Sequence, residues 1–202
     1  MKLEERMQKE RALKVTLDAC IIFPLAACDT LLHASEAGLY TPIWSTAILE
    51  EVFRTSRNVL HPHKYKGLSK RIADMNNSFP NAVVDSPIEA KTFPPHLLPD
   101  PDDAHVIATA VVSKSNFIVT ENLKDFPEKL LASLGIKAIS FDNFMSYLFD
   151  VDANAVQQAL TVLTLEKDNP PITVLEHLFK LEPLSPNFNK KVRERLASHN
   201  GS

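Results

Sequence analysis

Short apolar runs of the kind that form buried strands alternate with helical patterns along most of this chain. Five such runs occupy residues 14–18, 40–44, 81–85, 116–120 and 137–140. At least one segment with helical periodicity follows each run before the next begins. Alternation at this spacing predicts a parallel sheet with helices packed on its faces. We therefore expect an α/β fold, with a parallel central sheet of four to five strands flanked by helices.

The last fifty residues differ from this pattern because they contain no strand-like run. Helical segments are expected near 152–166, 171–181 and 187–198, separated by the proline-containing sequences "DNPP" and "EPLSP". We therefore predict an α/β domain over residues 14–150 and a helical C-terminal extension over residues 151–200.

Charge, cysteine content and the length of the apolar runs argue against a polycationic, disulfide-stabilised, zinc-binding or membrane-spanning protein. The formal net charge is −3, so any affinity for nucleic acid must come from a local patch. The two cysteines, Cys20 and Cys28, form neither a disulfide framework nor a zinc-binding spacing. The longest apolar run, "ACIIFPLAAC", is far shorter than the roughly 20 residues that a membrane-spanning helix needs. These features lead us to expect a cytoplasmic protein without a membrane anchor.

Several acidic segments are predicted to meet at one edge of the sheet. Asp18 ends the first strand, Thr120 ends the fourth, and Asp125 follows shortly after it. Parallel strands connected by right-handed crossovers place all their carboxyl ends along the same edge, where binding sites form. The acidic sequence "DPDD" at 100–103 begins the helix that leads into the fourth strand, so it can approach the same edge.

The three aspartates of "DPDD" have different expected positions on that helix. Pro101 suits the first helical position, which makes Asp100 the N-cap, accepting a hydrogen bond from the Asp103 amide. At 100° per residue, Asp103 lies on the apolar stripe, whereas Asp102 lies on a polar flank. Asp103 is therefore expected to be buried and Asp102 solvated. The alternative for Asp103 is stabilisation of the helix dipole alone.

The helix after the second strand carries two adjacent glutamates. Glu50 and Glu51 flank the apolar stripe of this helix about equally, so its geometry does not decide which one faces the acidic edge.

A carboxylate cluster with few histidines favours Mg²⁺ or Mn²⁺ over zinc. A cation held in this way can lower the pKa of water and neutralise the charge of a phosphodiester. The chain has neither a GxSxG nucleophile motif nor a glycine-rich phosphate loop.

A basic run without any acid follows the second acidic segment, between Val52 and Ala73. Such a run can hold a phosphate backbone, although a merely solvated helical face is an equally good interpretation. The candidate residues for binding a phosphate backbone in this run are Arg54, Arg57, Lys64, Lys66, Lys70 and Arg71.

Four motifs together resemble the PIN domain, especially the bacterial PIN-type ribonucleases that act as toxins of toxin–antitoxin pairs. They are "VTLDAC", "STAILEEV", "DPDDAHVIATAV" and "IVTENLKDFP", and the resemblance covers roughly residues 14 to 150. It implies RNA cleavage that depends on Mg²⁺ or Mn²⁺, an antitoxin encoded alongside, and frequently a homodimer. The catalytic and metal-binding residues that it implies are Asp18, Glu51, Asp103 and Asp125, with Thr120, Asn122 and Ser45 in support.

One position departs from the family pattern. Two residues after the first aspartate the family usually has asparagine or serine, whereas this chain has Cys20. This change leaves open a PIN-like module that binds RNA or protein without cleaving it. An aspartyl-phosphate enzyme is a further alternative, but the paired DxD motif of such enzymes is missing.

Overall fold

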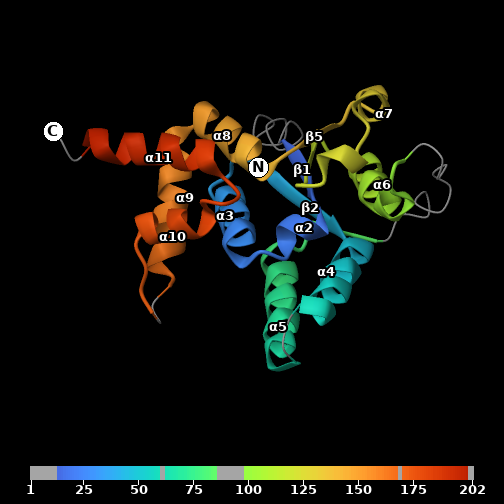
Figure 1. Cartoon of the computed structure of the whole chain (residues 1–202), viewed down its shortest axis with the longest axis horizontal. Helices are drawn as coiled ribbons and strands as arrows, with labels where there is room; N and C mark the ends of the chain where they lie inside the picture. The colour runs from blue at the N-terminus through green and yellow to red at the C-terminus, as the bar shows by residue number, and fades with distance from the viewer. Residues whose placement is uncertain (1–12, 60–61, 86–97, 168–169, 200–202) are drawn as a thin grey trace, which may run out of the picture.

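The computed structural model describes residues 13–59, 62–85, 98–167 and 170–199. Five parallel strands form one sheet in the order β3-β2-β1-β4-β5. The strands are β1 (Lys14–Leu17), β2 (Thr41–Ser45), β3 (Val83–Val84), β4 (Phe117–Val119) and β5 (Lys137–Ile139). The predicted α/β class, with a parallel sheet flanked by helices, is confirmed (Figure 1).

Helices connect consecutive strands, as parallel pairing requires. After β1 come α2 (Ala19–Ile22) and α3 (Leu25–Glu36), and after β2 come α4 (Thr46–Val59) and α5 (Pro62–Ser78). The later crossovers contain α6 (Ala104–Ser113) and α7 (Glu128–Ser133), and α8 (Phe141–Val151) follows β5. The sequence pattern does not predict the short α2. The polar segment over residues 66–78 predicts a helix, and α5 begins four residues earlier, at Pro62.

The start of α6 differs in detail from the prediction. Residues Pro101–Asp103 form a 3-10 turn, and the α-helix begins only at Ala104. Asp100 is the N-cap as predicted, but its side chain accepts from the Asp102 amide at 2.9 Å rather than from the Asp103 amide. The tighter turn moves the capped amide one residue toward the N-terminus. The proline-rich sequence "SPIEAKTFPPHLLPDP" at 86–101 predicts a long loop, most of which lies outside the described residues.

The core lies around β1, where every strand residue after Lys14 is buried. Helix α6 packs on β1, β2 and β4, and its buried face contributes Val106, Ile107 and Ala110. Trp44 of β2 is also fully buried, and its indole nitrogen donates to Asn76 Oδ1 of α5 at 2.9 Å. This packing fixes the strand ends from which the candidate site is built.

The C-terminal residues form three helices, as expected: α9 (Ala153–Leu165), α10 (Val174–Leu181) and α11 (Pro186–His199). They gather on the left of Figure 1, opposite α6 and α7. Helix α9 packs on α3 and α11 on α8, so their apolar residues join the main core. The domain boundary at residue 150 stays a prediction.

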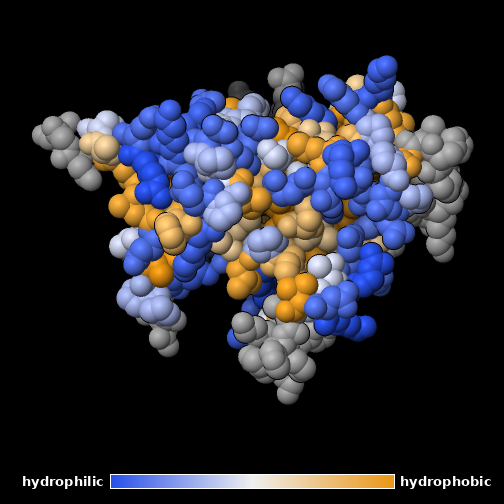
Figure 2. All heavy atoms as spheres, viewed as in Figure 1, coloured by the Kyte–Doolittle hydropathy of each residue, from blue (hydrophilic) through white to orange (hydrophobic). Residues whose placement is uncertain are grey.

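Figure 2 shows apolar side chains among the polar ones over the C-terminal helices, where Leu165 and Phe179 are exposed. In the described part of the chain, no helix has the length and apolar character needed to cross a membrane.

Candidate functional site

The strand order reverses between β1 and β4, which are neighbours in the sheet although β2 and β3 separate them in sequence. Crevices that bind ligands form at such a switch point, at the carboxyl ends of the strands. Asp18 follows β1 and Thr120 follows β4, and the Thr120 hydroxyl donates to Asp18 Oδ2 at 2.7 Å. The first predicted acid and its predicted supporting residue therefore lie together at this point.

Asp18 is a buried carboxylate with several donors around it. Only 2% of the residue is exposed, and its Oδ1 caps α2 by accepting from the Ala19 amide at 2.6 Å. Burial raises the pKa of Asp18, whereas the hydrogen bonds from Cys20, Thr120 and Ala19 oppose this rise. The donors offset part of the cost of holding a carboxylate anion in an apolar environment.

Cys20 supplies the hydrogen bond that the family pattern assigns to a polar residue. Its thiol donates to Asp18 Oδ2 at 3.0 Å. Burial, together with the neighbouring Asp18 carboxylate, raises the pKa of the Cys20 thiol far above its usual value. The thiol therefore keeps its proton and remains a donor at neutral pH.

This contact predicts different effects for two substitutions. Cys20→Ala removes a donor from a buried carboxylate, so we expect the free energy of unfolding to fall by about 1 to 2 kcal/mol. Cys20→Ser keeps a donor, so the expected change is below about 0.5 kcal/mol. Urea denaturation of both variants measures the difference, and equal stabilities would mean that the thiol contact contributes nothing.

Asp103 is buried, as its place on the apolar stripe predicts, with 8% exposure, whereas Asp102 is exposed. Among the described residues, no side chain forms an ion pair with Asp103. Burial and the charges of other carboxylates raise its pKa to about 7. In order of influence, those carboxylates are Asp18, Asp100, Glu51 and Asp125. Carboxylates from separate segments of the chain are therefore close enough to repel one another.

The structure distinguishes the two glutamates of α4. Glu50 is exposed, whereas the Glu51 side chain is 25% exposed and its charge acts on both Asp18 and Asp103. Glu51 Oε2 lies 3.1 Å from His105 Nε2. This distance is that of an ion pair, but neither atom forms a well-directed hydrogen bond within the described residues.

The other predicted residues lie around this centre. Asp125 ends the 3-10 turn Leu123–Asp125 and is half-buried. Asn122 is exposed, and its backbone amide donates to Thr120 Oγ1 at 3.0 Å. The buried Ser45 accepts from the Ile48 amide at 3.3 Å, so it caps the start of α4. Through these contacts Ser45 orients α4, while Asn122 orients the Thr120 hydroxyl.

Within the described residues, no three acidic, histidine or cysteine side chains are already arranged as a closed set of metal ligands. The donor chemistry nevertheless fits a cation. Asp103 is a buried carboxylate surrounded by like charges, and Glu51 Oε2 is shielded from solvent without a directed hydrogen bond. Hard carboxylate oxygens of this kind suit Mg²⁺ or Mn²⁺. A bound cation would remove the mutual repulsion.

The predicted basic run divides between two regions. Arg54 joins Glu50, Glu51, Asp102 and His105 in lining a cavity of about 380 Å³ beside the acidic centre. Arg57 lies with Arg54 along a neighbouring cavity, and Lys70 is exposed on α5. The side chains of Lys64 and Lys66 lie outside the described part of the structure.

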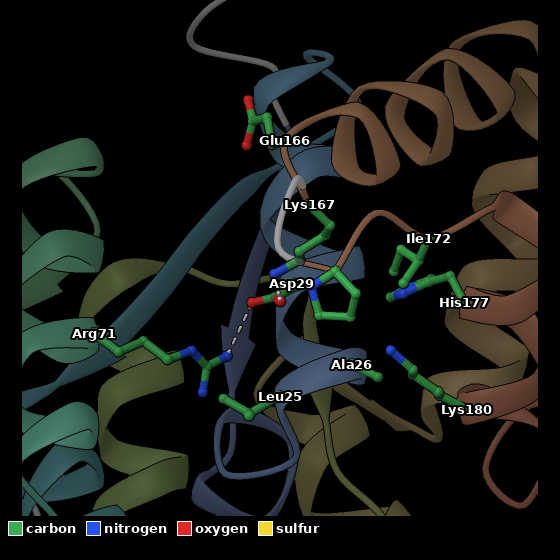
Figure 3. A pocket seen from close by; sticks show the side chains of 10 residues that line it. Leu25, Ala26, Asp29, Arg71, Glu166, Lys167, Ile172, His177 and Lys180 are labelled. Atoms are coloured by element: carbon green, nitrogen blue, oxygen red, sulfur yellow. Dashed lines mark hydrogen bonds and ion pairs between the residues drawn. The ribbon is translucent and has the colours of Figure 1, made fainter. Parts of the chain in front are cut away.

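Arg71 lies elsewhere, at a second cavity of about 570 Å³ between α3, α5 and the C-terminal helices (Figure 3). Its guanidinium donates to the Ile22 carbonyl at 3.2 Å and to Asp29 Oδ1 at 3.3 Å. Lys167 donates to the other Asp29 oxygen at 2.7 Å. Arg71 is thus held in an ion-pair network with the segment after α9, and this geometry does not place it beside the acidic centre.

His105 is the site residue that sequence reasoning missed. It is the second residue of α6, two positions after Asp103, and 16% of its side chain is exposed. Burial lowers the pKa of His105, but the Glu51 carboxylate and the Asp102 carbonyl outweigh this and raise it above the ordinary value. The only sequence feature that could have indicated His105 is its position on the same polar flank of α6 as Asp102.

Comparisons with known proteins agree with the geometry. A family profile described as a PIN domain matches residues 14–124. The chain is also similar to a curated protein of Mycobacterium tuberculosis named "Putative ribonuclease VapC50". Identity is 33% over 96 residues, which cover 48% of this chain and 57% of that protein. The chain therefore aligns with little more than half of that relative's length.

No solved structure matches the chain. The profile match nevertheless covers more than half of the 202 residues and includes Asp18, Glu51 and Asp103. This chain belongs to the PIN-domain family.

Proposed function

We propose that this protein is a metal-dependent endoribonuclease that hydrolyses RNA phosphodiester bonds. The observation that carries the proposal is the convergence of Asp18, Glu51, Asp103 and Asp125 at the switch point of the sheet, where burial and mutual charge raise the pKa of Asp103 to about 7. The name of the similar protein, a ribonuclease, supports RNA as the substrate.

In this proposal Asp18, Glu51, Asp103 and Asp125 hold Mg²⁺ or Mn²⁺. Such a cation supplies Lewis-acid stabilisation of phosphate charge and lowers the pKa of water. Thr120 and Cys20 keep the Asp18 carboxylate oriented through their hydrogen bonds. Arg54 lines the cavity beside the acidic centre, where its guanidinium can bind a phosphate of the RNA backbone.

The biological role that we propose is that of a cytoplasmic toxin. It rests on the resemblance to toxin ribonucleases and on the similar curated protein. A cognate antitoxin and a homodimer are the partners that this role implies. A small neighbouring gene that encodes a protein with a DNA-binding start would support the role.

Cleavage of RNA tests the proposed activity. The purified chain should cut RNA in the presence of Mg²⁺ or Mn²⁺ and lose this activity in excess chelator. Asp103→Asn removes a proposed ligand, so we expect the cleavage rate to fall by at least about 100-fold, since even partners of metal ligands contribute 10- to 100-fold. Asp102→Asn is the matched control, because Asp102 is the exposed neighbour and should retain nearly full activity.

Two outcomes would contradict the proposal. Undiminished RNA cleavage by Asp103→Asn would contradict the assignment of Asp103 to the catalytic site. RNA binding without cleavage, together with no divalent binding at millimolar concentration, would instead favour a PIN-like binding module.

A further inference from the structure

His105 connects two of the elements that carry the acidic side chains. It projects from the first turn of α6, two residues after Asp103, and reaches Glu51 of α4. Its ring is mostly shielded, with 16% of the side chain exposed. Nδ1 of the ring has a hydrogen-bond acceptor, and Nε2 lies at ion-pair distance from a carboxylate without forming a well-directed hydrogen bond.

The two ring nitrogens of His105 both face oxygen acceptors. Nδ1 lies 2.6 Å from the backbone carbonyl oxygen of Asp102, and a carbonyl can only accept, so Nδ1 donates. Nε2 lies 3.1 Å from the Glu51 carboxylate oxygen Oε2. The ring therefore joins the backbone turn that precedes Asp103 to the carboxylate of α4. A metal-ligating histidine also donates its other ring nitrogen in this way, but here Nε2 is shielded from solvent and faces a carboxylate oxygen at ion-pair distance.

Glu51 needs such a partner because its position on the helix does not fix its side chain. Glutamate loses about 1.5–2 kcal/mol of rotamer freedom when it is ordered, more than a short aspartate does. The preceding Glu50 lies on the same helix but remains exposed. Within the described residues, the one polar contact of Glu51 Oε2 is His105 Nε2.

We propose that His105 is a positioning residue that holds the Glu51 carboxylate toward Asp18 and Asp103, so that all three can share one cation. The inference rests on the proposed function. His105 does not touch the cation; it acts through Glu51 at one end and through the Asp102 backbone at the other. Rotation of Glu51 into solvent would remove one carboxylate from the centre and weaken metal binding.

Two amide substitutions separate the ends of the ring. The amide nitrogen of glutamine occupies nearly the place of Nε2, whereas that of asparagine occupies nearly the place of Nδ1. His105→Gln thus keeps the contact with Glu51 and loses the one with Asp102, and His105→Asn does the reverse. If His105 serves only to stabilise the turn before α6, His105→Asn should retain more Mn²⁺ affinity than His105→Gln. If His105 positions Glu51, His105→Gln should retain more.

The measurement is calorimetric titration of the full chain with Mn²⁺, alongside the midpoint of thermal unfolding. Partners of metal ligands typically contribute 10- to 100-fold to metal affinity. We expect His105→Asn to weaken Mn²⁺ binding by at least about 10-fold and His105→Gln by no more than about 3-fold. Equal affinities for the two variants, or tighter binding by His105→Asn, would overturn the inference.

A second comparison covers the case in which either variant unfolds. Glu51→Gln should weaken Mn²⁺ binding, and adding His105→Asn to it should cause no further loss, because residues that act through one contact are not additive. A further 10-fold loss in the double variant would contradict the role of His105. Failure of the unaltered protein to bind Mn²⁺ would overturn the proposed function itself, and this inference with it.

Discussion

The Asp103→Asn substitution is expected to stabilise the metal-free protein by about 2 kcal/mol at pH 8, although it lowers the rate of RNA cleavage. Asp103 is buried among other carboxylates, which raise its pKa from 3.8 to about 7. An acid whose pKa is raised by folding destabilises the folded state at every pH at which the unfolded chain ionises it. Solvent screens part of this electrostatic destabilisation, so the expected gain in stability is smaller than the full pKa shift of Asp103 implies.

The sign of the Asp103 effect depends on pH. Below about pH 4 the group is protonated in both the folded and unfolded states, so Asp103→Asn should change stability little. The advantage of the variant should grow as the pH rises and be complete above about pH 7. For a chain of this size, 2 kcal/mol corresponds to about 4–8 °C in the unfolding midpoint.

Saturating Mn²⁺ is the control for this prediction. A cation offsets the repulsion in the unaltered protein but not in the variant, so added Mn²⁺ should reduce or reverse the difference in stability. A variant that is less stable than the unaltered protein at pH 8 without metal would contradict the placement of Asp103 among repelling carboxylates.

Acidification is expected to destabilise the protein through His177 of α10. This residue is 2% exposed, and its Nε2 lies 2.8 Å from Thr30 Oγ1 of α3. The Thr30 hydroxyl donates to the Ala26 carbonyl at 2.8 Å, so it accepts from Nε2 of a neutral ring. Burial, with Lys180 and Lys167 in addition, lowers the pKa of His177 from 6.5 to about 4 against the opposing charge of Asp29.

The unfolded chain takes up this proton at a higher pH than the folded one. The contribution of His177 is therefore complete above about pH 6.5 and is lost as the pH falls toward 4. The loss should be about 2–3 kcal/mol. His177→Gln keeps a donor to Thr30 but does not titrate, so it is the matched control. Urea denaturation between pH 7.5 and 4.5 measures both proteins, and parallel pH profiles would contradict the prediction.

The contacts of His177 also help to attach the C-terminal helices to α3. Its hydrogen bond to Thr30 and the Lys167–Asp29–Arg71 ion pairs lie around the same cavity (Figure 3). Both sets of contacts join residues separated by more than 40 positions. Sequence periodicity reports which residues face inward on a helix, but not which other element they meet.

The parts of the site that follow local rules could be predicted from sequence. Parallel topology brings Asp18 and Thr120 to one edge, and helical periodicity separates the buried Asp103 from the exposed Asp102. The cap at Asp100 was also predictable, but its partner amide was not. That detail depends on the choice between a 3-10 and an α turn, which the two carboxylates after Pro101 do not determine.

Other features depended on contacts between elements. Glu50 and Glu51 flank their helix stripe equally, and only the packing of α4 beside α6 places Glu51 against His105. Arg71 belongs to the basic run by sequence, yet in the folded structure it forms an ion pair with Asp29. Both cases involve long side chains whose direction the backbone alone does not fix.

Mn²⁺ affinity of the Asp103→Asn and Asp102→Asn variants, measured by calorimetry, tests the central claim most directly. The two aspartates are adjacent, but only Asp103 is buried among the carboxylates. We predict millimolar or tighter binding by the unaltered protein, a loss of at least about 10-fold in Asp103→Asn, and a change below about 3-fold in Asp102→Asn. Equal binding by all three proteins would contradict a divalent-metal site at this edge of the sheet.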